Sequence, residues 1–150
     1  MSDAPDAMTN MPWIRWLDLD TTMEDDGTLR VALLRPKPEH FNHNGHVNAA
    51  VAYGVAEVAG AGAAVRGLGP LLASTYTVIE TGSIAYRRPA RDGLVARARV
   101  SPADVADAAG AVERGEPRNL AVEVELADAS GTATGTCSFV VALRPRRPPS

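Results

Sequence analysis

The run from Val47 to Val65 (VNAAVAYGVAEVAGAGAAV) carries a single charged residue, Glu57, and is rich in alanine and glycine. Alanine favours a helix, for which Asn44 or Asn48 can serve as the N-cap. A helix that is apolar on every face has to be covered on most sides. We therefore expect a sheet to wrap around it and a second subunit to cover what that sheet leaves open.

On both sides of this run the hydrophobic period changes to the alternation that is typical of strands. Strands are predicted at 28–35, 74–88, 94–100, 119–127 and 133–143, the last four as an antiparallel meander with a bulge at Gly82. Residues 11–19 predict a short amphipathic helix or an irregular cover. The stretch 102–117 predicts a surface insertion with a helical turn after Ser101. The fold class that follows is α+β, with one long apolar helix wrapped by a five-stranded antiparallel sheet.

The 150 residues, 45% of them hydrophobic, predict one domain at 1–150, with a core at about 28–143, a loose N-terminus and a loose Pro/Arg-rich tail. A net charge of −3 with scattered arginines argues against nucleic-acid binding. The single cysteine, Cys137, cannot form an internal disulfide and is expected to be a packed thiol. The N-terminus has no apolar run of signal-peptide length, and Glu57 with its neighbouring glycines makes 47–65 a core helix and not a membrane span. We expect a cytoplasmic protein.

Glu57 is the strongest candidate for a catalytic residue. Its helical neighbours three and four positions away, Tyr53, Gly54, Gly60 and Ala61, cannot pair with it as a cation would. We expect it to be buried, and burial would raise its pKa toward the range of a general base. The alternative is that Glu57 marks the one solvated stripe of the helix.

The segment 39–48 (EHFNHNGHVN) holds all three histidines of the chain and predicts an ordered loop before the helix. Asn42 and Asn44 offer amide donors, and the helix start near Asn48 and Ala49 offers unpaired backbone N–H groups, which together suggest an oxyanion hole. The alternative is that these side chains only cap the helix and close turns. The histidines are spaced by three, without the i, i+4 pattern of a zinc helix, so no metal site is predicted.

Two runs resemble a known family: 42–57 (NHNGHVNAAVAYGVAE) and 77–93 (TVIETGSIAYRRPARDG). They are similar to hotdog-fold acyl-CoA thioesterases of the phenylacetate-degradation and 4-hydroxybenzoyl-CoA types. The resemblance implies that Asn42 orients the thioester carbonyl or the water, that the Ala49 amide stabilises the oxyanion, and that Glu57 is base or nucleophile. Asn48 stands where the family usually has histidine, and Ala49 and Ala50 replace two glycines.

The resemblance also implies a homodimer or homotetramer, with each site built from the loop of one subunit and the helix of another. Coenzyme A enters as part of the substrate and no separate cofactor is expected. The residues expected to bind the substrate are His46, Tyr53, Thr75, Thr77, Arg87 and Arg88. The small residues around Tyr53 leave room for a medium or aromatic acyl group, and the two arginines suit the phosphates of coenzyme A.

Two other functions stay open. Hydroxyacyl-thioester dehydratases of the same fold place a loop histidine fourteen residues before a helical glutamate, the relation of His43 to Glu57. The Pro-Gly pair expected at their helix start is absent here. A non-catalytic acyl-CoA-binding module would keep the cavity and use Glu57 structurally.

Overall fold

The computed structural model of the chain describes residues 10–146; the predicted loose ends at 1–9 and 147–150 lie outside them. The elements are, in chain order, α2 (Pro12–Leu17), β1 (Asp20–Met23), β2 (Leu29–Leu33), the 3₁₀ helix η1 (Pro38–His40), α3 (Ala49–Val65), the 3₁₀ helix η2 (Gly69–Ser74), β3 (Thr75–Tyr86), β4 (Leu94–Arg99), α4 (Pro102–Glu113), β5 (Arg118–Ala127) and β6 (Ala133–Pro145). Within this part of the chain, none of the helices is both long and apolar enough to cross a membrane.

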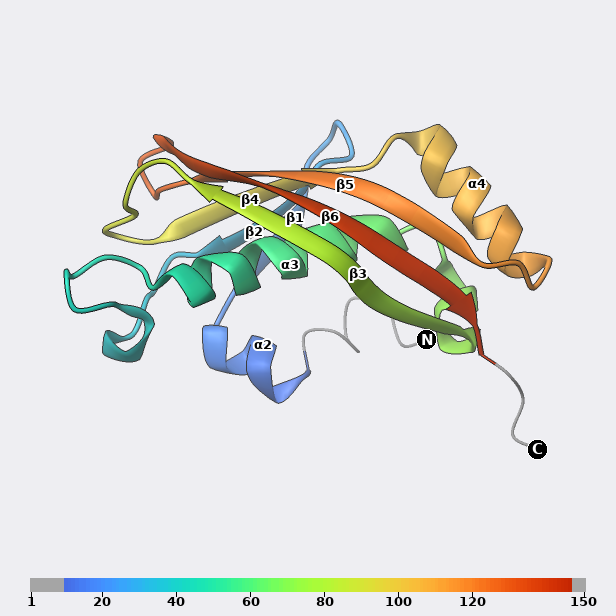
Figure 1. Ribbon diagram of the computed structural model, residues 1–150, viewed down its shortest axis with the longest axis horizontal. Helices are drawn as coiled ribbons and strands as arrows, with labels where there is room; N and C mark the ends of the chain where they lie inside the picture. The colour runs from blue at the N-terminus through green and yellow to red at the C-terminus, as the bar shows by residue number, and fades with distance from the viewer. Residues whose placement is uncertain (1–9, 147–150) are drawn as a thin grey trace.

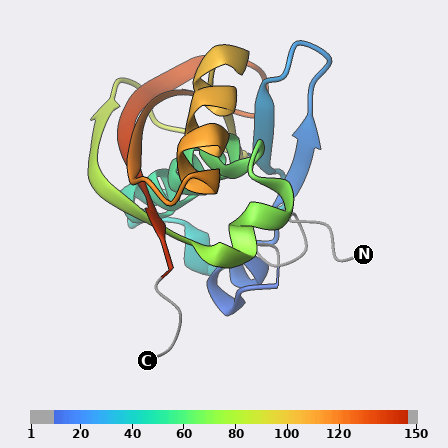
Figure 2. The same cartoon turned by 90° about the vertical axis from the view of Figure 1, so that its right-hand side faces the viewer.

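The strands form one antiparallel sheet in the order β1-β2-β4-β5-β6-β3, which curls over α3 (Figures 1 and 2). The expected architecture of a long helix wrapped by a sheet is confirmed, but the sheet has six strands and not five. The additional strand, β1, pairs with β2 at the edge of the sheet. Its sequence, DTTM, has no buried residue, so it lacks the alternation by which the other strands were recognised.

The predicted four-strand meander is wrong in one connection. Strands β4, β5 and β6 follow one another as neighbours, but β3 lies at the far edge of the sheet beside β6. The pairing of β3 with β6 runs from Thr75↔Pro145 to Tyr86↔Gly135. Hydrophobic alternation identifies a strand without identifying its partner, so the sequence could not distinguish this crossover from a hairpin.

The bulge in β3 lies at Glu80 and not at Gly82, because the register shifts between Ile79 and Thr81. A bulge adds one residue and reverses which positions face the core. Ile79 is opposite buried Val141 and Gly82 is opposite buried Phe139, so both face inward. Gly82 is therefore not the bulge but the residue that the bulge turns toward α3.

The predicted N-cap of α3 is confirmed, since the Asn48 side-chain oxygen accepts a hydrogen bond from the Ala50 amide at 2.9 Å. The helix ends at Val65, just before the glycines expected to end it. Most of α3 is buried under the sheet. Its less buried positions include Ala50, Tyr53, Glu57 and Ala61, which share one stripe at helical spacing. Tyr53 reaches the sheet through its ring, whereas Ala50 and Glu57 are exposed.

Helix α4 replaces the surface insertion predicted at 102–117. It extends for 12 residues, and the Ser101 hydroxyl caps it by accepting from the Asp104 amide. Ala108, Ala111 and Val112 are buried, and the helix packs against β5 and β6 (Figure 2). The helical turn after Ser101 is confirmed, but the segment closes one end of the core.

Cys137 on β6 is buried in the core cluster, as expected for a packed thiol. Its neighbour along the strand, Phe139, is the largest of the fully buried side chains. Burial, with a smaller contribution from the negative charge of Glu123, raises the pKa of the Cys137 thiol to about 11. The thiol is therefore neutral at physiological pH.

Candidate active site

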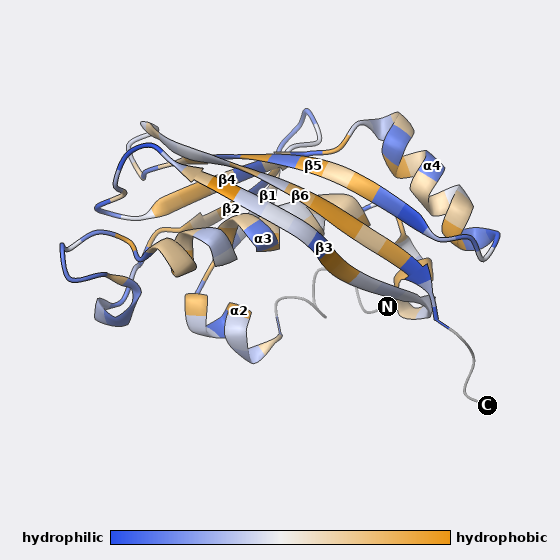
Figure 3. Cartoon of the chain, viewed as in Figure 1, coloured by the Kyte–Doolittle hydropathy of each residue, from blue (hydrophilic) through white to orange (hydrophobic). Residues whose placement is uncertain are grey.

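The loop before α3 is held by Asn42. Its side-chain oxygen accepts hydrogen bonds from the amides of Asn44 at 2.9 Å and His46 at 3.2 Å. This is the turn-closing role that was the alternative for Asn42, and it leaves the side-chain NH₂ as the group available to a ligand. The loop forms a largely hydrophilic projection at the N-terminal end of α3 (Figure 3).

The N-terminus of α3 keeps free backbone donors where the oxyanion hole was expected. Asn48 occupies the Ala50 amide, whereas the Ala49 amide has no acceptor within residues 10–146. The Tyr86 hydroxyl donates to the Ala49 carbonyl at 2.8 Å and ties β3 to the first turn of the helix. A free N–H at the positive end of a helix dipole favours a developing negative charge.

A cavity of about 310 Å³ lies at this helix end. It brings together five of the predicted site residues: Asn42, His46, Ala49, Arg87 and Arg88. The backbone amides of both arginines donate to the Thr134 carbonyl, which fixes this part of the chain. Neither arginine side chain forms an ion pair in the described part of the chain, so both guanidinium groups can receive a ligand anion.

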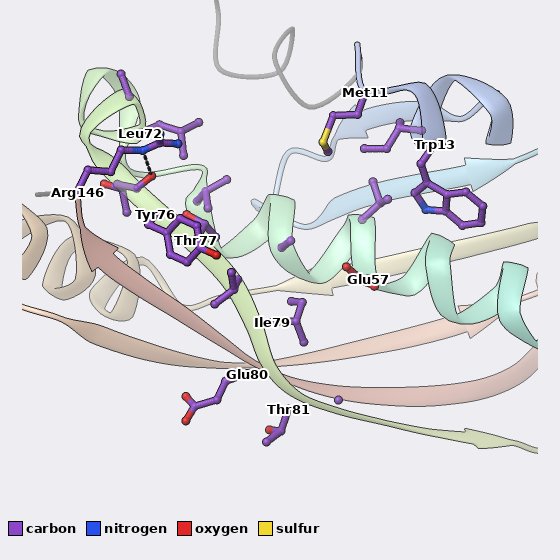
Figure 4. Close-up of a pocket in the computed structure, with 18 of the residues that line it drawn as sticks. Met11, Trp13, Glu57, Leu72, Tyr76, Thr77, Ile79, Glu80, Thr81 and Arg146 are labelled. Carbon is purple, nitrogen blue, oxygen red and sulfur yellow. Dashed lines mark hydrogen bonds between the residues drawn. The ribbon is translucent and has the colours of Figure 1, made fainter. Parts of the chain in front are cut away.

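A larger groove of about 1340 Å³ runs between α3 and β3 and is bounded by α2 and η2 (Figure 4). It contains four further predicted site residues: Tyr53, Glu57, Thr75 and Thr77. The tenth, Asn48, lines neither cavity and acts as the helix cap. One chain therefore divides the predicted site between two cavities, with the loop and helix start in one and the carboxylate in the other.

Glu57 is exposed in this chain, so the predicted burial is wrong for the isolated subunit. The sheet covers the opposite side of α3 and leaves the Glu57 stripe facing the groove. Figure 4 shows its carboxylate between α3 and β3. Its position in the groove is one that a site residue can have. In the single chain, the alternative that Glu57 marks a solvated stripe of the helix is the one observed.

Tyr53 lies one helical turn before Glu57 and packs edge-on against Phe139, with ring centroids 5.5 Å apart. Its hydroxyl lies against Gly82, where a Cβ atom would clash with it. Burial is the main cause that raises the pKa of Tyr53, and the negative charge of Glu57 adds to it. The phenol therefore stays protonated and can donate a hydrogen bond.

The two threonines of β3 differ in what they can offer. The Thr75 hydroxyl donates to the Leu71 carbonyl at 2.7 Å and is already used. The Thr77 hydroxyl is buried without a partner among the described residues. Of the two, Thr77 has the unused hydrogen-bonding group.

The three histidines do not converge. His40 is fully buried, and its Nδ1 accepts from the Lys37 amide at 3.1 Å, while His43 is exposed and lines neither cavity. Within residues 10–146, no three His, Cys, Asp or Glu side chains are placed to hold a metal ion together. His40 instead organises the loop, because its carbonyl accepts the Asn48 amide at 2.8 Å.

Helix α2 is part of the site, which the sequence did not indicate. Met11, Trp13 and Ile14 line the groove that contains Glu57, and Tyr86 lines the smaller cavity. The apolar pattern of 11–19 predicted that this segment packs on the core, but it does not identify the part of the core that it contacts. Tyr86 lay inside the run that carries the family resemblance, yet only the fold brings its hydroxyl to Ala49.

An antiparallel sheet curled around one long helix, with a polar loop leading into that helix, defines a protein of the hotdog-fold class. The chain belongs to the family described as Domain of unknown function (DUF4442), whose profile matches residues 9–143. No curated protein matches the chain.

Solved structures share the fold. A putative thioesterase from Shewanella oneidensis is 18% identical, with a TM-score of 0.78 over 94% of each chain. A probable thioesterase from Pseudomonas aeruginosa is 20% identical, with a TM-score of 0.70 over 91% of this chain and 89% of that one. The PaaI protein of the phenylacetic acid degradation operon of E. coli is 14% identical, with a TM-score of 0.67 over 98% and 92%. The hotdog expectation is thus confirmed at the level of fold.

Proposed function

We propose that the protein is a thioesterase that hydrolyses an acyl-CoA thioester, with Glu57 as its general base or nucleophile. The observation that carries the proposal is the position of Glu57, the sole charge on α3, in a groove with largely apolar walls. Thioesterase names among structures of the same fold support the reaction class. A carboxylate beside a thioester carbonyl can deprotonate a water molecule or attack the carbonyl carbon.

In the general-base form, Glu57 removes a proton from water as the water oxygen bonds to the thioester carbonyl carbon. The carbonyl electron pair moves to oxygen and forms a tetrahedral oxyanion. The free Ala49 amide at the dipole end of α3 suits that charge. Collapse breaks the carbon–sulfur bond and releases the acid, and the thiolate of coenzyme A takes up the proton from Glu57, which restores the carboxylate.

A homodimer, which can pair further into a tetramer, would join the two cavities. Glu57 lies in the groove of one chain, whereas Ala49 and Asn42 lie in the other cavity. A second copy placed over the uncovered stripe of α3 would bring its loop and helix start to this Glu57. It would also cover β3, which has a free edge in the single chain.

Coenzyme A is part of the substrate, and Arg87 and Arg88 are the groups we assign to its phosphates. Both flank the cavity that contains Ala49 and have no competing carboxylate among residues 10–146. A guanidinium group binds phosphate oxygens through paired N–H donors.

The test is thioester cleavage by Glu57→Gln, followed with a thiol-trapping dye over a panel of acyl-CoAs. Gln keeps the shape of the side chain but can neither accept the proton nor act as the nucleophile, and we expect kcat to fall by about 10²-fold or more. The matched control is Glu125→Gln, which removes the same charge from an exposed position on β5. It should retain wild-type activity.

An unchanged rate in Glu57→Gln would remove Glu57 from the chemistry. If the wild-type protein binds acyl-CoA without turnover, it is a binding module and not a thioesterase. Assaying hydration of 2-enoyl-CoA alongside tests the dehydratase, which requires His43 as well as Glu57.

A further inference from the structure

Trp13 of α2 lies over the same face of α3 as Glu57. The edge of its indole rests on the helix backbone at Gly54, where an added Cβ would come within 2.9 Å of the ring. Gly54 is three residues before Glu57, so the indole and the carboxylate are neighbours along one side of α3. Figure 4 shows both side chains at the groove, with Trp13 toward the N-terminal end of the helix.

The indole is held in place although it is 49% exposed. Trp13 stacks on Trp16, with ring centroids 5.3 Å apart and an interplanar angle of 19°. Trp16 in turn meets the buried ring of His40 edge-on at 4.5 Å. A large apolar side chain that is half exposed and yet anchored can contact a ligand with little loss of its own conformational freedom.

The groove offers nothing to balance a second negative charge beside Glu57. Its one arginine, Arg146, donates to the Thr75 carbonyl at 3.2 Å, near the η2 end of the groove and away from Trp13. Apolar side chains line the groove around Glu57, including Val58, the next residue on α3, and Ile79 of β3. An anionic acyl group placed there would be desolvated next to a like charge.

We propose that Trp13 is a specificity-determining residue, and that the groove takes neutral, apolar acyl groups long enough to reach from Glu57 to the indole. This inference rests on the proposed thioesterase function, because Glu57 marks where the thioester lies. It adds a residue outside the two runs that resemble the thioesterases, and it defines the class of acyl group. Acyl groups that stop short of the indole should not depend on Trp13.

The experiment compares Trp13→Ala with wild type on acetyl-, pentanoyl-, succinyl-, octanoyl- and benzoyl-CoA. Removing the indole should lower kcat/KM for octanoyl- and benzoyl-CoA by roughly ten-fold or more. This is the size of effect that the loss of one or a few methylene contacts has in an apolar pocket. The acetyl-CoA value should stay within about two-fold of wild type. Succinyl-CoA should be cleaved much more slowly than pentanoyl-CoA, its neutral counterpart, by both proteins. The control is Leu34→Ala, which truncates another large exposed apolar residue, 40% exposed and outside the groove.

Two further measurements separate the possible failures. Calorimetry of binding tests the inference even without turnover. Trp13→Ala should weaken the binding of octanoyl-CoA and leave the binding of coenzyme A alone unchanged. If turnover is absent but this difference appears, the proposed function fails and the specificity role stands. Equal losses for acetyl- and octanoyl-CoA overturn the inference. So does a change of oligomeric state in analytical ultracentrifugation with an unchanged acyl preference, because Trp13 would then be an interface residue between copies.

Discussion

The contact between Gly60 of α3 and Phe139 of β6 limits how closely the sheet approaches the helix. Substituting the two residues separately and together tests that packing. A Cβ atom at position 60 would lie 2.8 Å from Cδ2 of Phe139, a ring that is 1% exposed and cannot move aside. Gly60→Ala gains about 1 kcal/mol of helix propensity but incurs about 1–3 kcal/mol of overpacking. We expect a net loss of unfolding free energy of about 0–2 kcal/mol.

Phe139→Val removes the ring carbons that clash, Cδ2 among them, and, alone, leaves a void. Combined with Gly60→Ala, the overpacking disappears and the new methyl group fills part of that void. The double variant should therefore be more stable than the sum of the single changes by about 1–3 kcal/mol. Equilibrium urea unfolding at a fixed protein concentration measures all four proteins of the cycle.

Gly110→Ala is the matched control, since the nearest atom to a Cβ there belongs to the flexible side chain of Arg114. It should stabilise α4 by about 0.5–1 kcal/mol through helix propensity alone. If Gly60→Ala stabilises the protein as much as Gly110→Ala does, Phe139 does not limit the space at position 60. The same holds if the effects of Gly60→Ala and Phe139→Val are simply additive.

Three other changes test the framework around the site. Asn48→Ala should lower the unfolding free energy by about 1 kcal/mol through loss of the α3 cap, and Asn48→Asp should not, as measured by urea unfolding. Arg66→Ala removes hydrogen bonds to the Gly27 and Val100 carbonyls; it should lower the thermal midpoint, with a loss of about 1.5–3 kcal/mol. The raised pKa of Cys137 means that the unfolded chain ionises first, so unfolding free energy should fall as the pH rises from 9 toward about 11. A Cys137→Ala variant that shows the same alkaline fall would exclude the thiol as its cause.

Much of the fold follows from local sequence pattern. The alanine-rich run from Val47 to Val65, with Glu57 as its single charge, predicted α3, and Asn48 was one of the two predicted caps. Alternation predicted β2 and the four strands after α3 to within a few residues. The edge strand β1 was missed because neither of its faces is buried, and a strand without a buried face has no alternation to detect.

The parts that the sequence could not predict are those set by partners distant in the chain. The place of β3 beside β6 depends on pairing across the sheet, and the bulge at Glu80 depends on the register of that pairing. The exposure of Glu57 has the same origin. Its surroundings on α3 are apolar, as predicted, but the sheet covers only one side of that helix.

The site was predictable as a set of residues but not as an arrangement. Every predicted site residue except Asn48 lines one of two cavities, and Asn48 caps the helix between them. No feature of the sequence indicated that Trp13 would lie beside Glu57, because residues 11–19 and α3 meet only through tertiary packing.

The central claim is that Glu57 of one subunit and the Ala49 amide of another act on the same thioester. Ala49→Pro is a precise change for this purpose. Proline fits the first position of a helix and removes the amide hydrogen, and the extended backbone of Asn48 (φ −58°, ψ 140°) accepts a following proline. Each variant alone, Ala49→Pro or Glu57→Gln, should be inactive as a homodimer.

The decisive measurement is the thioesterase rate after the two inactive variants are unfolded together in equal amounts and refolded. A heterodimer then carries one site with both changes and one site with neither. Random pairing makes half of the dimers mixed, so the account predicts recovery of about a quarter of wild-type activity. If Glu57 and Ala49 of the same chain formed the site, every site would stay defective, and no recovery of activity would contradict the account.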